Sequence, residues 1–149
     1  MKLSLMLCGL CLVTLIACQK DKFTTTPQVD LKSITPNSVV LGDIIRLKGT
    51  FTDKEGDVDS AYIVYKWYNG ANIVRNDTFR YYLPALGVPA ATKDGDILVE
   101  FSYGQFQNGY VQIGSVSKDT TSTFGIMLVD HQKNKSEYKE SKQIRLLKP

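Results

Sequence analysis

Four carboxylates lie close together in the segment DKEGDVD, residues 53 to 59, around a single glycine. They belong to Asp53, Glu55, Asp57 and Asp59. A group this rich in oxygen can hold Ca²⁺, which takes about six to eight oxygen ligands in proteins. The spacing is not that of an EF-hand, because the glycine stands fourth rather than sixth in the loop and the twelfth position is valine. The alternative is an acidic turn between strands that needs no ion.

Few other residues could do chemistry. His131 is the only histidine of the chain, and it directly follows Asp130. A hydrolytic triad needs a nucleophile, a base and an orienting acid in contact, and a zinc site needs several nitrogen, sulfur or carboxylate ligands. The sequence contains neither a GxSxG segment nor a glycine loop that opens a helix to cradle phosphate. We therefore expect a protein that is not an enzyme.

The three cysteines all lie at the N-terminus. After Met1 and Lys2 comes an uncharged run of apolar residues, LSLMLCGLCLVTLIA. A membrane-spanning helix needs about 20 apolar residues, so this shorter run after a basic residue predicts a secretory signal peptide over residues 1–17. A retained membrane anchor is the alternative. The CxxC pair, Cys8 and Cys11, falls inside the signal and would be removed with it.

The end of this run, LIAC, resembles the lipobox of bacterial lipoproteins: an aliphatic residue, a tolerant position, a small residue and a cysteine. The resemblance implies cleavage after Ala17 and acylation of Cys18 with diacylglycerol and a palmitate-type chain. Two or three acyl chains hold a protein stably on a membrane, whereas one chain does so only marginally. Gln19 is not the aspartate that retains many Gram-negative lipoproteins in the inner membrane, so the resemblance implies the outer membrane, on its periplasmic face or at the cell surface.

We expect three parts: the signal peptide at residues 1–17, an acylated cysteine with a polar, threonine-rich tether at 18–27, and one domain at 28–149. The chain carries 18 basic and 15 acidic side chains. This balance, without a stripe of lysine or arginine, predicts no binding of nucleic acid.

Residues of the domain alternate between apolar and polar, as in β-strands. In DIIRLKGTF, for example, Ile45, Leu47 and Phe51 share one face and Arg46 and Lys48 the other. No window shows a helical period. The runs predict about seven or eight strands, at 29–34, 43–51, 61–67, 72–82, 96–103, 109–116, 123–130 and 142–147. An all-β protein of this kind is a sandwich or a small barrel.

The run FTDKEGDVDSAYIVYKW resembles the strand B to strand C region of bacterial immunoglobulin-like domains of the PKD and cadherin-like kinds, with Trp67 as the core tryptophan. FGIMLVDHQKNKS resembles strand F and the turn after it. The resemblance implies an antiparallel immunoglobulin-like β-sandwich. The B–C and F–G loops of such a sandwich emerge at one end, so Asp130 could approach Asp57 or Asp59. The chain also enters strand A at that end, which would place the acidic loop and His131 near the tether.

Tyrosines gather in the middle third of the chain. By alternation Tyr62 and Tyr68 point outward, and one of the neighbours Tyr81 and Tyr82 must do so. An outward tyrosine row could stack on sugar rings or form a protein-binding face. Ordinary packing between strands is the alternative.

These patterns predict a non-catalytic lipoprotein with an immunoglobulin-like domain, acting as a binding or accessory component of an envelope assembly. Its partners would be the membrane, through the lipid, and a protein or a glycan. A glycan-binding module that uses the outward tyrosines is the alternative. No cofactor is expected apart from a structural Ca²⁺.

The lipobox prediction has a direct test. Cys18→Ser should abolish metabolic labelling with a radioactive fatty acid and release the protein from washed membranes, because the thiol is the acceptor for the diacylglycerol. Cys11→Ser, inside the signal, should leave both unchanged. Undiminished labelling of the Cys18→Ser variant would exclude the lipobox.

Overall fold

The computed structural model describes residues 24–149 of the chain. The predicted signal peptide, Cys18 and most of the tether therefore lie outside the described residues. Within the described part, no helix is long and apolar enough to cross a membrane.

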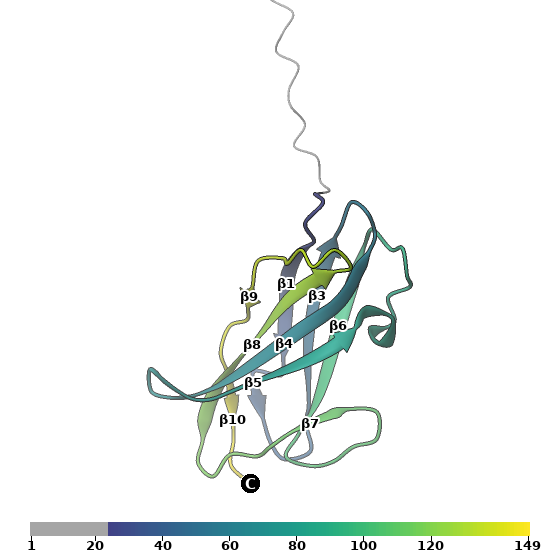
Figure 1. The fold of residues 1–149 in the computed structure, drawn as a ribbon. Coiled ribbons are helices and arrows are strands. Elements are labelled where there is room, and N and C mark those ends of the chain that lie inside the picture. Colours follow the sequence, from purple (N-terminus) through teal and green to yellow (C-terminus); the bar gives the residue numbers. More distant parts are fainter. Residues whose placement is uncertain (1–23) are drawn as a thin grey trace, which may run out of the picture.

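Two β-sheets pack face to face (Figure 1). The smaller has the order β1-β3-β6-β7, made of Gln28–Thr35, Ile44–Thr52, Asp94–Tyr103 and Val111–Ile113. The larger has the order β2-β10-β8-β4-β5, made of Ser38–Val39, Ile144–Leu146, Thr120–Asp130, Val58–Asn69 and Asn72–Tyr82. In addition, β9 (Lys139–Glu140) pairs with β8, and a 3₁₀ turn, η1 (Leu83–Leu86), follows β5.

The strands form where the sequence alternates, because successive side chains of a strand point to opposite faces of the sheet. In β3, Ile45, Leu47 and Phe51 are buried, while Arg46 and Lys48 are exposed. β6 and β8 also bury their alternating apolar residues, namely Ile97, Val99, Phe101, Phe124, Ile126 and Leu128. β8 in addition buries residues of its other face, such as Thr123 and Gly125. The predicted core faces are thus the observed ones.

Aromatic rings fill the centre of the core. Phe101 of β6 is fully buried, and its ring centroid lies 5.6 Å from that of Phe79, 5.4 Å from that of Phe124 and 6.5 Å from that of Tyr81. These contacts join the two sheets, since Phe101 belongs to the smaller and the other three to the larger. Trp67 lies at the margin of this core, half-buried.

The predicted all-β antiparallel sandwich is confirmed, and each of the eight predicted runs contains a strand. The count differs because the described residues form ten strands. The two that we did not predict, β2 and β9, have 2 residues each, too few for any alternation to show. Two short pairings, β2 with β10 and β6 with β7, are parallel.

The entering chain and the acidic loop share one end of the sandwich, as expected (Figure 1). The Lys54 N–H donates to the carbonyl of Thr24 at 3.1 Å, and the His131 N–H donates to the carbonyl of Asp57 at 3.1 Å. The C-terminus lies at the opposite end (Figure 1). The β3–β4 loop is therefore tied to the entering chain on one side and to the end of β8 on the other.

The inter-sheet aromatic packing predicts a large difference between two phenylalanines. Phe101→Ala removes a fully buried ring and should lower the free energy of unfolding by about 3–5 kcal/mol. Phe106→Ala removes a ring that is 72% exposed and should change it by less than about 0.5 kcal/mol. Urea unfolding measures both, and equal effects would contradict this description of the core.

Candidate functional site

Three of the four carboxylates of the β3–β4 loop come together. Asp53, Glu55 and Asp57 each present an oxygen within 4.8 Å of the other two. The turn between them depends on Gly56, which has a φ of 71°. A Cβ at this position would lie 2.8 Å from the carbonyl oxygen of Ala91, so a larger residue would strain the backbone and collide with the neighbouring loop. We call Asp53, Glu55 and Asp57 the acidic cluster.

Asp53 is the buried member of the acidic cluster, with no exposed surface. Its Oδ2 accepts the Asp57 N–H at 2.9 Å, and its own N–H donates to the carbonyl of Lys93 at 2.7 Å. Oδ1 of Asp53 and Oδ1 of Asp57 are both buried and have no hydrogen-bond partner. Burial, with a further contribution from the neighbouring Asp57 charge, raises the pKa of Asp53. The loop thus holds negative charge that its own donors only partly compensate.

Asp59, the fourth carboxylate, lies apart from the acidic cluster. The register between β4 and β8 shifts between Val58 and Ser60, so Asp59 stands at a β-bulge. Its Oδ2 accepts a hydrogen bond from Arg80 Nη2 at 2.9 Å, and its Oδ1 lies 3.8 Å from His131 Nδ1. The Asp59 carboxylate therefore interacts with Arg80 and His131 and does not belong to the acidic cluster.

Asp130, which we expected to approach Asp57 or Asp59, directs its carboxylate to Asn134 in the turn after β8. It is fully buried and pairs across the sheet with Val58. Its carboxylate accepts two hydrogen bonds from Asn134, one from the backbone N–H at 2.7 Å and one from the side-chain amide at 2.8 Å. These bonds close the turn that follows β8, and the Asp130 carboxylate is not among those that group around the acidic loop.

Two of the four candidate tyrosines flank an arginine. Tyr62 of β4 lies opposite Arg80 of β5 in the sheet. The Arg80 guanidinium carbon is 5.8 Å from the centre of the Tyr62 ring and 4.9 Å from the centre of the Tyr82 ring. Tyr82 is 58% exposed. We call Tyr62, Arg80 and Tyr82 the arginine–tyrosine platform, which the Asp59 carboxylate holds in place.

The other two tyrosines do not join this platform. Tyr81 points inward onto Phe101, and its buried hydroxyl has no partner. Burial raises the pKa of Tyr81 to about 12. Tyr68 stands near the far end of β4, where its hydroxyl lies 3.1 Å from Thr123 Oγ1. The tyrosines therefore form a pair around an arginine and not a continuous row.

A hollow of about 370 Å³ adjoins the platform at the tether end. Asp57, Asp59, Tyr82 and His131 line one part of it, and apolar residues between Leu83 and Ala91 line the rest. Neither Arg80 nor this apolar segment was among the predicted site residues. Only the pairing of Arg80 with Tyr62 across two strands could have indicated the platform, and the sequence does not state that pairing.

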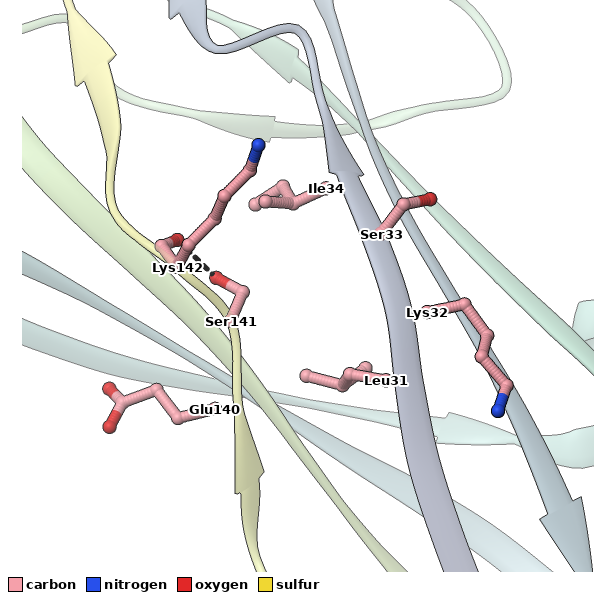
Figure 2. A pocket seen from close by; sticks show the side chains of 7 residues that line it. All are labelled: Leu31, Lys32, Ser33, Ile34, Glu140, Ser141 and Lys142. Atoms are coloured by element: carbon pink, nitrogen blue, oxygen red, sulfur yellow. Dashed lines mark hydrogen bonds between the residues drawn. The ribbon is translucent and has the colours of Figure 1, made fainter.

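A second hollow, of about 290 Å³, lies between β1 and residues 140–142. Figure 2 shows Leu31 and Ile34 pointing from β1 toward this gap, while Lys32 and Ser33 point away from it. Here the register of β1 against β3 shifts between Leu31 and Ser33. This hollow is the seam between the sheet edges, and it brings together no group of side chains comparable with the platform.

No known protein-family profile matches the chain, and no curated protein matches it. Several solved structures align with most of the chain. A DNA glycosylase AlkC from Pseudomonas fluorescens aligns at 11% identity with a TM-score of 0.47, over 84% of this chain and 31% of that one. The sporulation control protein Spo0M from Bacillus subtilis aligns at 6% and 0.42, over 85% and 51%. A Niemann-Pick type C2 protein from the Japanese carpenter ant aligns at 13% and 0.41, over 85% and 94%. The chain thus spans about a third and about half of the first two, and these likenesses carry no argument about function.

The position of Asp130 predicts that it stabilises the turn after β8. Asp130→Ala leaves two Asn134 donors without their charged acceptor and should lower the free energy of unfolding by about 2–4 kcal/mol. Asp96→Ala, at an exposed aspartate of β6, is the matched control and should change it by less than about 0.5 kcal/mol. Urea unfolding compares the two variants, and equal small losses would show that the buried bonds contribute nothing.

Proposed function

We propose that this chain is a lipid-anchored, non-catalytic binding or accessory protein of the Gram-negative outer membrane, with one immunoglobulin-like domain. The proposal joins the lipobox sequence, which ends at Cys18, to the position of the arginine–tyrosine platform in the fold.

The strand order supports the immunoglobulin-like part of the proposal. In such domains strands A, B and E share one sheet, and strands G, F and C share the other. Here β1, β3 and β6 lie together in the order of A, B and E, and β10, β8 and β4 lie together in the order of G, F and C. β5 then corresponds to the additional strand beside C in variable-type domains.

The exposed platform is the observation that carries the binding function. Tyrosine and arginine are enriched in protein interfaces and dominate their binding energy. In the platform an arginine is already stacked on one exposed ring and paired with a carboxylate that is itself only 15% exposed. A side chain held in this way loses little conformational freedom when a partner binds.

The end of the sandwich at which the platform lies favours a partner in the same membrane. Tyr62 stands near the start of β4, and Tyr82 ends β5, where it pairs with Ser60 of β4. The start of β4 lies on the side where the chain enters the domain (Figure 1). A tether of about nine residues reaches at most about 30 Å. A protein embedded in or attached to the same membrane would lie within that reach, which supports the accessory role.

A glycan is the second candidate ligand. Tyr82 borders the hollow together with Asp59 and His131. An exposed aromatic ring beside side chains that donate and accept hydrogen bonds is an arrangement that suits a sugar ring. The two candidates share one surface and differ in the ligand.

The test compares three forms of the lipidated protein: the wild type, Tyr82→Ala and Phe106→Ala. Tyr82→Ala should lower the yield of a defined crosslinked partner in intact membranes by about tenfold or more, because truncation of a dominant interface residue costs about 2 kcal/mol. Phe106→Ala removes an exposed ring outside the platform and should leave the yield unchanged.

A glycan array run on the same proteins separates the candidates. Glycan binding that disappears in Tyr82→Ala would replace the protein partner with a sugar. Crosslinking and array signals that are the same for all three forms would exclude the platform as the binding surface.

A further inference from the structure

We infer that the acidic cluster, Asp53, Glu55 and Asp57, binds one calcium ion at the junction between tether and domain. This site is separate from the arginine–tyrosine platform and does not depend on the function proposed for it. The spacing of the oxygens, the unpartnered buried oxygens and the fixed loop each support it.

The spacing of the oxygens suits calcium. Three carboxylate oxygens, one from each member of the acidic cluster, lie within 4.8 Å of one another. Two oxygens that bind the same Ca²⁺ at about 2.3–2.6 Å can be up to about 5 Å apart. Mg²⁺ demands near-ideal octahedral geometry and gives up its waters reluctantly, so a group of three protein carboxylates favours calcium. All three ligands offer oxygen only, which excludes the nitrogen and sulfur donors that zinc and copper prefer.

Unpartnered oxygens point to a cation independently of the clustering. Asp53 has no exposed surface, and its Oδ1 is buried without a hydrogen-bond donor. Oδ1 of Asp57 is likewise buried and has no hydrogen-bond donor. A buried carboxylate oxygen that has neither a donor nor a cation is costly, because the water that solvated it has been removed.

Neighbouring side chains do not supply the missing positive charge. Among the ion pairs within 4.0 Å that join described residues, none involves a member of the acidic cluster. Asp59, two residues after Asp57 in the sequence, has a cationic partner, and that partner is Arg80 of the platform. A divalent cation would satisfy both unpartnered oxygens at once.

The loop is held in place before any ion binds. Backbone hydrogen bonds join Asp53 to Lys93 at 2.7 Å, Lys54 to Thr24 at 3.1 Å and Asp57 to His131 at 3.1 Å. A site fixed by three separate segments loses little conformational entropy on binding. The bond from Lys54 also ties the loop to the entering chain, so calcium would stiffen the connection between the tether and the domain.

The test uses the full-length lipidated protein in detergent, with CaCl₂ as the ligand. At about ten times its dissociation constant, Ca²⁺ should favour the folded state about 11-fold over EDTA and raise the thermal midpoint by about 5 °C. Calorimetric titration should show one site per chain. MgCl₂ at the same concentration should give a smaller shift.

Two variants decide the assignment. Glu55→Gln alters an exposed residue and should leave the fold intact while it weakens Ca²⁺ binding by about tenfold or more. Asp96→Asn, at an exposed aspartate of β6, removes the same charge elsewhere and should leave Ca²⁺ binding unchanged.

Three results would overturn the site: no shift and no heat of binding with wild type, equal shifts with calcium and magnesium, or equal losses in the two variants. The first would mean that a shared proton compensates Asp53 and Asp57.

Discussion

The two-sided pairing of β4 is the constraint on which the rest of the structure depends. β4 is hydrogen-bonded to β5 on one side and to β8 on the other. Because side chains alternate with a period of two, a slip of one residue would turn the inward face of the strand to solvent. Ala61, Ile63 and Tyr65 are fully buried or nearly so, and their burial therefore selects a single register on both sides.

That register positions both candidate sites. It sets Tyr62 beside Arg80 on β5, and it sets Val58 beside Asp130 on β8. The β-bulge between Val58 and Ser60 turns Asp59 toward Arg80 and separates it from the acidic cluster. The arginine–tyrosine platform and the acidic cluster thus lie at one end of the sandwich without sharing a charged residue. This separation allows each to be altered without the other.

The negative charges of the two sites are compensated to different degrees. Arg80 and Asp59 neutralise each other at a distance of 2.9 Å, and the pair remains partly open to water, where such an interaction contributes little stability but fixes an orientation. Asp53 is buried, and its pKa is raised by burial and by the charge of Asp57. A protein retains an uncompensated group of this kind at a cost in stability. The cost is understandable if the loop has a ligand.

Local patterns in the sequence determined the strands other than β2 and β9, the inward faces such as Ile45 and Leu47, and the turn at Gly56, because each of these depends on residues that are neighbours along the chain. The same patterns placed Tyr81 and Tyr82 on opposite faces without deciding which one was buried. Tertiary structure alone decided that Tyr81 packs on Phe101, that Arg80 stands between two tyrosines, and which carboxylates meet. These outcomes depend on register and on one bulge between strands distant in sequence, and no spacing along the chain encodes a bulge between Val58 and Ser60.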